Sequence, residues 1–335
     1  MPPDDAAQAA ENAQTIGFLL VPGFALMSYA SAMEPLRAAN RLAGRPLYAW
    51  RHISPDGAAA AASNGMSLLP DGRVGEDVPL DALLVCAGGN PAQFDHPPTF
   101  RWLRALAHKG VQLGGVSGGP YLLARAGLLD GHRCTIHWEH IPAFVEEFPD
   151  LEVERTLYVV DRDRLTCAGG IAALDMMHAL IERDHGHGLA AAVSEWFLHT
   201  DVRLGSGPQR MTLRERFGIS NPKLLKVLER MEANLEEPVT RERLAAVAGV
   251  SVRQLERLFT AHLGATLGEH YARIRLDRAR ALLRQTTLPV LEVAVACGFV
   301  SASHFSRAYK GRFGWSPKAE RLTESTGARR NPRAR

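Results

Sequence analysis

The sequence predicts two domains of different class: an α/β domain with a parallel sheet between helices, and after it an all-helical domain. In residues 16–188, short apolar runs alternate with segments of helix-length apolar spacing, which is typical of a parallel sheet that helices cover on both faces. From about residue 189 the strand signals stop, and residues 223–321 show only short helical patterns. A chain of 335 residues with 46% hydrophobic content is long enough for two such cores.

The apolar runs of the first domain predict its strands and the edge where it binds ligands. Strands are predicted at 16–21, 81–89, 111–116 and 165–170. Helices are predicted at 27–42, 99–110, 120–129 and 172–186. Glycines recur just past the carboxyl ends of these strands, and open α/β sheets bind their ligands at that edge.

The sequence shows no signal for export, for a membrane span or for a metal site. The first fifteen residues lack a basic and apolar leader, and no apolar run reaches the roughly 18 residues of a membrane helix. The cysteines lie far apart without a C-x-x-C pair, at Cys86, Cys134, Cys167 and Cys297. We therefore expect a cytoplasmic protein with buried, reduced thiols, no membrane partner, no metal and no cofactor.

Charge is distributed unevenly along the chain. Residues 221–335 hold 21 Lys and Arg against 11 Asp and Glu, whereas the residues before them hold 18 against 25. The two parts therefore carry net charges of +10 and −7. A basic segment of this kind suits a polyanionic partner such as nucleic acid, although a solvated helical surface would show the same excess.

A stretch punctuated by Gly, Ser and Pro connects the two parts. It runs over 201–222 with the sequence DVRLGSGPQRMTLRERFGISNP. We expect a first domain over residues 15–200, a linker over 201–220 and a helical domain over 221–321.

The helical domain contains a repeated unit. Segments 244–259 and 293–309 each place an alanine four residues before a glycine, followed by a serine. The small residue lets two helices cross closely, the glycine forms the turn, and the serine can cap the second helix. These residues are Ala245, Gly249 and Ser251 in the first segment and Ala294, Gly298 and Ser301 in the second. The repeat, joined by a helical pattern over 270–286, predicts a double helix-turn-helix domain.

With its second unit and tail, ACGFVSASHFSRAYKGRFGWSPKAER, the segment 221–321 resembles the AraC/XylS DNA-binding domain. The resemblance implies that a linker helix holds two recognition helices about one turn of DNA apart. Both would enter the major groove of double-stranded promoter DNA. The resemblance also implies an activator of transcription, with RNA polymerase as a further partner.

Each recognition helix has an apolar side and an outward side. Leu255, Leu258 and Phe259 form the apolar stripe of the first helix, and Phe305 and Tyr309 pack inward in the second. The outward residues are the DNA-binding candidates Arg253, Gln254, Arg257, Ser303, His304 and Arg307. Arg can contact guanine and Gln can contact adenine, while others hold phosphate. For any single one of them, a solvated helix face is the alternative.

The first domain contains Gly115-Val116-Ser117-Gly118-Gly119, a match to the G-x-S-x-G nucleophile elbow of serine hydrolases. His137 could act as the base, with Glu139 or Asp175 as the carboxylate. However, hydrolases with this elbow place the histidine after the acidic residue, late in the fold, whereas His137 follows Ser117 by only 20 residues.

Residues 16–188 resemble the PfpI-type, glutamine-amidotransferase-like domain that occurs fused to AraC-type domains. The resemblance lies in FLLVPGF, DALLVCAGG, PYLLARAGLLDGHRCTIHW and LTCAGGIAALDMMHALIERDHG. It implies a flavodoxin-like parallel sheet, and catalytic members of that superfamily hold a cysteine at the elbow. Here Ser117 takes that place, and a serine hydroxyl is a far weaker nucleophile than a thiolate. We therefore predict no catalytic residue and no enzyme.

An elbow without its cysteine is predicted to bind a small effector. The backbone N–H groups of Ser117 and Gly118 would hold an anion, while Gly88 and Gly89 allow close approach. His137 and Trp138 would add a polar and an aromatic contact, with ordinary packing as the alternative. We expect Gly118→Val to block the site by placing a branched side chain across it and straining a positive φ. The resemblance implies an amino-acid-like or betaine-like nitrogen metabolite as the effector.

The expected function is that of a homodimeric DNA-binding regulator in which an effector shifts the balance between two conformations. Two alternatives stay open. One is a serine hydrolase or amidotransferase-like enzyme fused to a DNA-binding domain. The other is a DNA-binding protein whose first domain only dimerises.

Overall fold

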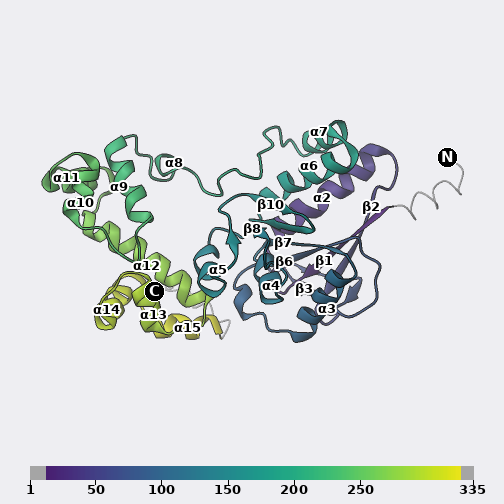
Figure 1. Cartoon of the computed structure of the whole chain (residues 1–335), viewed down its shortest axis with the longest axis horizontal. Helices are drawn as coiled ribbons and strands as arrows, with labels where there is room; N and C mark the ends of the chain where they lie inside the picture. Colours follow the sequence, from purple (N-terminus) through teal and green to yellow (C-terminus); the bar gives the residue numbers. More distant parts are fainter. Residues whose placement is uncertain (1–12, 326–335) are drawn as a thin grey trace, which may run out of the picture. The chain divides into compact units, whose positions relative to one another are not determined.

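The structure is a computed structural model that describes residues 13–325 and divides the chain into two compact units. The first unit ends at Gln209 and the second begins at Arg210. Figure 1 shows an α/β unit from β1 to α7 and a helical unit from α8 to α15. The two classes of domain predicted from the sequence are confirmed.

A seven-stranded sheet in the order β10-β11-β7-β6-β1-β2-β5 forms the centre of the first unit. Its strands are β1 (Gln14–Leu20), β2 (Tyr48–Ser54), β5 (Gly72–Arg73), β6 (Ala82–Ala87), β7 (Gln112–Ser117), β10 (Tyr158–Asp161) and β11 (Arg164–Cys167). Neighbouring strands pair in parallel, except that β10 runs antiparallel to β11. The predicted parallel, flavodoxin-like sheet is therefore confirmed.

Helices cover both faces of this sheet. Along β1, Ile16, Phe18 and Leu20 face one core while Leu19 faces the other, as the two-residue period of a strand requires. The first core is closed by α2 (Leu26–Ala43), α6 (Ala172–His185) and α7 (His187–Trp196). The second is closed by η1 (Pro91–Gln93), α3 (Pro97–His108), α4 (Gly119–Arg125) and α5 (Ile141–Glu147). Figure 1 shows the sheet between these two layers.

Several elements of the first unit were not predicted. They are β2, β5, β10, η1, α5, α7 and two small pairs, β3 (Ala60–Ala61) with β4 (Ser67–Leu68) and β8 (Arg133–Cys134) with β9 (Glu152–Val153). The strands β2 and β10 lie toward the edges of the sheet, where a strand tolerates polar residues such as Arg51 and Asp161. Such residues break the apolar runs from which strands were predicted.

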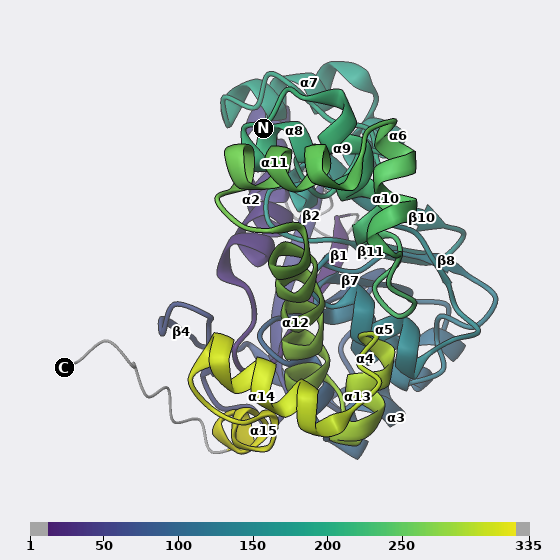
Figure 2. The same cartoon turned by 90° about the vertical axis from the view of Figure 1, so that its left-hand side faces the viewer.

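The second unit is all-helical in its described part. Its helices are α8 (Leu213–Phe217), α9 (Pro222–Glu232), α10 (Arg241–Ala248), α11 (Val252–Leu263), α12 (Leu267–Gln285), α13 (Val290–Ala296), α14 (Ala302–Phe313) and α15 (Pro317–Ser325). Figure 2 shows α12 running between the group α9 to α11 and the group α13 to α15. Over residues 13–325, no helix is both long and apolar enough to cross a membrane.

The stretch predicted as a linker is docked at both of its ends. Arg203 and Gln209 form hydrogen bonds with the first unit. Phe217 and Ile219 pack into the helical core, and Arg216 pairs with Glu232 at 3.0 Å. Both halves of the stretch therefore belong to folded units.

Candidate effector site and nucleic-acid interface

Ser117 ends strand β7 in the left-handed region of backbone conformation, with φ of 59°. For a residue with a side chain this conformation costs roughly 1–2 kcal/mol, so the surrounding structure must hold it. Helix α4 begins two residues later, at Gly119, and Ser117 is only 7% exposed. The sharp strand-to-helix turn that the sequence motif predicts is present.

The glycines around Ser117 let α4 lie close to the sheet. A Cβ on Gly119 would stand 2.0 Å from the carbonyl oxygen of Val85, and one on Gly115 would stand 2.5 Å from the nitrogen of Pro120. Real Cβ atoms do not approach this closely. These two glycines are therefore explained by packing, without reference to a ligand.

Our expectation for the backbone of Gly118 is wrong. Its φ is −84°, so the positive φ belongs to Ser117, and its N–H donates to the carbonyl of Ala87 at 3.1 Å. The space of its missing side chain is bounded by Pro91, whose Cγ would lie 3.2 Å from an added Cβ. A valine at this position would push against Pro91 instead of crossing an open approach.

Gly88 and Gly89, which follow strand β6, differ in the space around them. A Cβ on Gly88 would stand 2.8 Å from the carbonyl oxygen of Gly23, so Gly88 serves a close contact between loops. Gly89 has φ of 60° and nothing within 4 Å of an added Cβ. Open space at the edge of the elbow therefore lies at Gly89.

The structure brings His137 to the elbow through the backbone. Its N–H donates to the carbonyl oxygen of Ser117 at 3.3 Å, and its ring lies 5.4 Å from that of Trp138 and 5.8 Å from that of His140. Burial lowers the pKa of His137, while Glu139 partly opposes the shift. The imidazole is therefore neutral at neutral pH. Trp138 is 41% exposed, which leaves part of its ring available to a ligand.

The described residues do not form a Ser-His-acid arrangement. No hydrogen bond within residues 13–325 joins the Ser117 hydroxyl to the His137 ring. The carboxylate of Asp175 is occupied by His199 and Arg203. Among residues 13–325, the only hydrogen bond between Glu139 and His137 runs from the backbone N–H of Glu139 to Nδ1, at 3.4 Å.

No thiol replaces the missing elbow cysteine. Cys86 and Cys167 lie on the strands that flank β7, and both are buried and free. Burial raises the pKa of Cys167 to about 12, and it also raises that of Cys86. Because the thiolate is the nucleophile, neither cysteine is activated.

Sequence reasoning missed three polar residues that bind either Asp175 or the residue before His137. His199 and Arg203 bind Asp175, and the amide of Gln209 binds the carbonyl of Ile136, the residue before His137. They lie in or next to the stretch that looked like a linker, where polar residues carry no periodic signal. One signal in the sequence indicates such partners: Asp175 lies in the apolar helical segment AALDMM, and a buried carboxylate needs hydrogen-bond donors.

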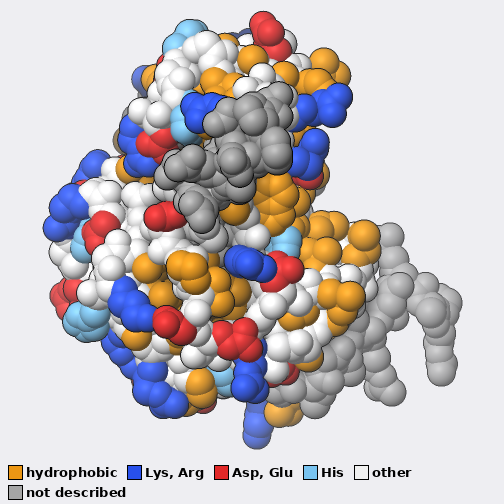
Figure 3. All heavy atoms as spheres, turned by 90° about the vertical axis from the view of Figure 1, so that its right-hand side faces the viewer, with side chains coloured by type: hydrophobic (Ala, Val, Ile, Leu, Met, Phe, Trp, Pro, Cys, Tyr) orange, Lys and Arg blue, Asp and Glu red, His pale blue; other side chains and the backbone are white. Residues whose placement is uncertain are grey.

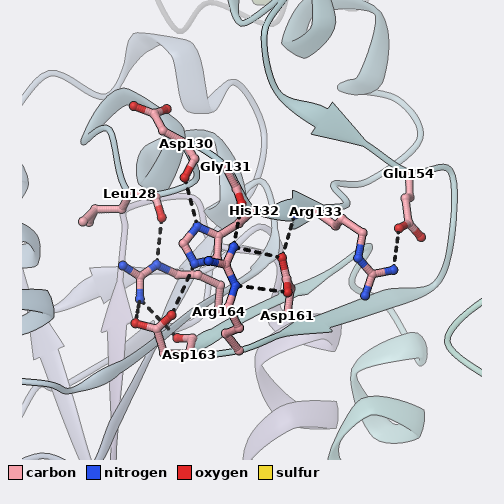
Figure 4. A network of polar contacts seen from close by, with 10 residues as sticks. Leu128, Asp130, Gly131, His132, Arg133, Glu154, Asp161, Asp163 and Arg164 are labelled. Atoms are coloured by element: carbon pink, nitrogen blue, oxygen red, sulfur yellow. Dashed lines mark hydrogen bonds and ion pairs between the residues drawn. The ribbon is translucent and has the colours of Figure 1, made fainter.

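A polar network anchors the chain before His137 (Figure 4). Arg164 donates to the carbonyl of Leu128 at 2.7 Å and pairs with Asp163 at 2.6 Å. The N–H of Arg133 donates to Asp161 at 2.9 Å, and its guanidinium pairs with Glu154 at 3.0 Å. These contacts tie the loop that leads to His137 to the hairpin of β10 and β11.

The two helix-turn-helix units have the predicted geometry. Gly249 and Gly298 form the turns with φ of 61° and 71°. Ser251 caps α11 and Ser301 caps α14, each accepting a hydrogen bond from the N–H three residues later. The six DNA-binding candidates on α11 and α14 are all exposed: Arg253, Gln254, Arg257, Ser303, His304 and Arg307.

The candidates differ in what already occupies their side chains. The amide oxygen of Gln254 accepts from the N–H of Ser251 at 3.0 Å, so part of this side chain serves the helix cap. In the described part of the chain, Arg307 forms a hydrogen bond only with the carbonyl of Ser303, at 3.4 Å. Arg253 has no hydrogen bond or ion pair among the described residues, which leaves its guanidinium available to DNA.

Helix α12 connects the two units, and its side chains tie them together. It has 19 residues, a length of about 28 Å. Tyr271 accepts from the N–H of Val239 at 3.1 Å, and Arg275 donates to the carbonyl of Gly298 at 2.9 Å. Side chains one turn apart in the first half of α12 therefore bind both units, which restricts the spacing of α11 and α14. Two exposed recognition helices, α11 and α14, follow an α/β unit in the sequence. This arrangement defines the class of the protein, a DNA-binding regulator with a separate α/β domain.

Comparison with known proteins agrees with this class. The sequence model of the DJ-1/PfpI family matches residues 14–183, and that of a helix-turn-helix domain matches residues 244–322. The chain is 47% identical to HTH-type transcriptional regulator GlxA of Rhizobium meliloti, over 93% of this chain and 97% of that protein. It is 44% identical to HTH-type transcriptional regulator GbdR of Pseudomonas aeruginosa, over 94% of this chain and 86% of that protein.

A solved structure of an AraC family transcriptional regulator from Pseudomonas putida is similar to part of this chain. It is 30% identical with a TM-score of 0.50, over 55% of this chain and 99% of that one. The chain belongs to the family of HTH-type transcriptional regulators that join a DJ-1/PfpI domain to an AraC-type helix-turn-helix domain.

Proposed function

We propose that this regulator activates transcription when a small nitrogenous metabolite, amino-acid-like or betaine-like, binds at the Ser117 elbow. The observation that carries the proposal is an elbow that keeps its strained turn but has neither an activated nucleophile nor an oriented base. We infer that the first unit has no catalytic residue and works as a sensor.

The proposed effector contacts are Ser117, His137 and Trp138, with Gly89 at the open edge; Gly88 and Gly118 shape the site through packing. Because Nδ1 of His137 accepts from the backbone N–H of Glu139, the neutral imidazole carries its proton on Nε2, which can donate to a carboxylate. The half-exposed indole of Trp138 suits a quaternary ammonium or guanidinium group, since aromatic faces attract such cations. This pair supports a ligand with both a carboxylate and a cationic nitrogen.

A thermal-shift experiment on the full chain tests the sensor. The probes are glycine betaine, carnitine and arginine, with acetate and tetramethylammonium as controls that each carry one of the two groups. We expect a compound with both groups to raise the melting temperature in the wild type and in Ser117→Ala. The shift should be lost in Trp138→Leu. Ester or amide turnover that disappears in Ser117→Ala would instead favour the alternative, a serine hydrolase.

We further propose that α11 and α14 bind promoter DNA through the six exposed candidates, and that the regulator acts in the cytoplasm, where its DNA is.

We also propose that the regulator forms a homodimer and contacts RNA polymerase. On the face shown in Figure 3, hydrophobic side chains lie in groups among charged ones of both signs. The first unit exposes large apolar side chains, among them Ile171, Trp196, Leu198 and Leu204. Sedimentation equilibrium of the full chain should give the mass of a dimer.

A further inference from the structure

The peptide group between Ile136 and His137 is held from both sides. Its N–H, on His137, donates to the carbonyl oxygen of Ser117 at 3.3 Å. Its carbonyl, on Ile136, accepts from Nε2 of Gln209 at 2.9 Å. A trans peptide is planar and rigid, and its N–H and C=O point in opposite directions. One rigid group therefore joins the elbow to Gln209, the last residue of the first unit.

The side chain of Gln209 is fixed by two further acceptors. Its Nε2 donates to the carbonyl of Thr156 at 2.7 Å and to the hydroxyl of Thr135 at 3.0 Å. Two of the three acceptors are carbonyls, which only accept, so the amide nitrogen must point toward them. Its Oε1 is buried without a hydrogen-bond partner among the described residues. These contacts therefore require the NH2 group of the Gln209 amide, and not its oxygen, to face Ile136 and Thr156.

Gln209 ends a segment, residues 199–209, that we call the strap. His199 and Arg203 hold its beginning on Asp175, and the carbonyl of Gly205 accepts from the N–H of Leu157 at 2.8 Å. Beyond Gln209 the chain enters the helical unit, where Thr212 caps α8 through a capping box. The strap therefore leads directly from the elbow contacts into the DNA-binding unit.

We propose that Gln209 is a positioning residue that couples the elbow to the helical unit. The inference rests on the proposed function, because it assigns to the effector site the route by which it acts on DNA binding. A ligand at Ser117 and His137 shifts the 136–137 peptide. The hydrogen bond between the carbonyl of Ile136 and Gln209 changes as a result. The ligand then favours one of two states of the strap, which is what regulation requires.

The link itself can be tested without any ligand. Gln209→Glu keeps the shape of the side chain but replaces its donor by an acceptor, which faces the carbonyls of Ile136 and Thr156. Ser206→Asp is the matched control, since Ser206 is an exposed strap residue and the change adds the same charge. Amide hydrogen exchange at His137 should be about tenfold faster or more in Gln209→Glu and unchanged in the control, the scale of one lost hydrogen bond. Unchanged exchange at His137 would overturn the coupling.

Transmission is tested by DNA affinity of the full chain, for a duplex selected with it from a random library. The probe at the elbow is Ser117→Asn, because asparagine tolerates the left-handed conformation. We expect Ser117→Asn to change the Kd about fivefold or more in the wild-type background, the range of coupling between sites, and to have no effect in Gln209→Glu. A purely structural Gln209 would leave the elbow effect in place.

The outcomes separate the two proposals. If the effect of Ser117→Asn persists in Gln209→Glu, Gln209 is not the coupling residue and the sensor stands. If Ser117→Asn has no effect in the wild-type background, the coupling is overturned, while the thermal shift with glycine betaine, carnitine and arginine decides on the sensor separately. Should Gln209→Glu fail to fold, Gln209→Ala replaces it, since it removes the donor without adding a charge to the half-buried site.

Discussion

Asp175 on helix α6 holds Arg203 through both of its carboxylate oxygens. Oδ1 accepts from the backbone N–H of Arg203 at 2.9 Å and from Nε2 of His199 at 2.8 Å. Oδ2 accepts from the guanidinium, at 2.5 Å from Nη2 and 3.1 Å from Nε. The side chain of Asp175 is fully buried, and a buried carboxylate is tolerated only when donors satisfy it in this way. The beginning of the strap is therefore fixed to the α/β unit.

Replacing this aspartate should destabilise the first unit. Asp175→Ala leaves the Arg203 guanidinium without its partner, and breaking a buried ion pair costs about 3 kcal/mol or more of unfolding free energy. Urea unfolding measures the loss. Asp184→Ala is the control, because its pair with Arg183 is partly exposed and is worth less than about 1 kcal/mol. Equal losses in the two variants would contradict a buried clamp.

The elbow glycines give a second stability prediction. Gly119→Ala places a Cβ 2.0 Å from the carbonyl oxygen of Val85, so helix α4 must move away from strand β6. We expect a loss of about 3 kcal/mol, at the upper end for overpacking. Gly188→Ala, in helix α7, is the matched control, since nothing lies within 4 Å of its added Cβ. It should be neutral or stabilise by up to about 1 kcal/mol, because alanine favours helix more than glycine. Thermal melts of both variants decide the matter.

The central strands and the repeat were predictable because they follow simple periods. The strands β1, β6 and β7 are buried on both faces and form continuous apolar runs. The turn glycine and capping serine of each helix-turn-helix unit are local requirements that any sequence must meet. The strand β2, next to the short edge strand β5, was missed because its side chains are partly exposed, as the mixed burial along it shows.

The site was only partly predictable, for a different reason. Ser117 was found from its motif, but which neighbour takes the space beside each glycine depends on contacts far along the chain. Pro91 bounds Gly118, and Gly23 bounds Gly88. Likewise, Gln209 and Ile136 are 73 positions apart in the sequence, so no local sequence pattern predicts their hydrogen bond.

Buried His270 should make stability depend on pH. Its ring lies 5.6 Å from Phe217 and 5.7 Å from Phe259, and burial lowers the pKa of His270 to about 4. Arg273 lowers this pKa further, while Glu232 and Asp277 oppose the shift. In the unfolded chain a histidine titrates near 6.5, so unfolding takes up a proton below that pH. The stabilising contribution is present above about pH 6.5 and is lost as the pH falls toward 4.

A pair of variants isolates this contribution. His270→Gln stays neutral at every pH, and its urea midpoint should fall less than that of the wild type between pH 7 and pH 5. His262→Gln should behave like the wild type, because His262 is exposed on α11. If His270→Gln keeps the full pH dependence of the wild type, other groups are responsible for it.

Arg253 and Gln254 should behave differently toward DNA although they are neighbours on α11. The guanidinium of Arg253 is unoccupied among the described residues, whereas Oε1 of Gln254 accepts two hydrogen bonds from Ser251. Arg253→Ala should lose about 1–3 kcal/mol for one base pair of the selected duplex and spare other positions. Gln254→Ala should instead lower helix stability by about 1 kcal/mol through the lost cap.

The measurement is a titration of the full chain with the selected duplex and with single-base variants of it, at several salt concentrations. Because residues 221–335 carry a net charge of +10, affinity should fall steeply with salt in every variant. Arg101→Ala serves as the charge-matched control, since Arg101 is exposed on α3 of the first unit and should leave affinity and selectivity unchanged. A loss for Arg253→Ala that is equal for all duplexes and lowers the salt slope would assign Arg253 to a phosphate instead of a base.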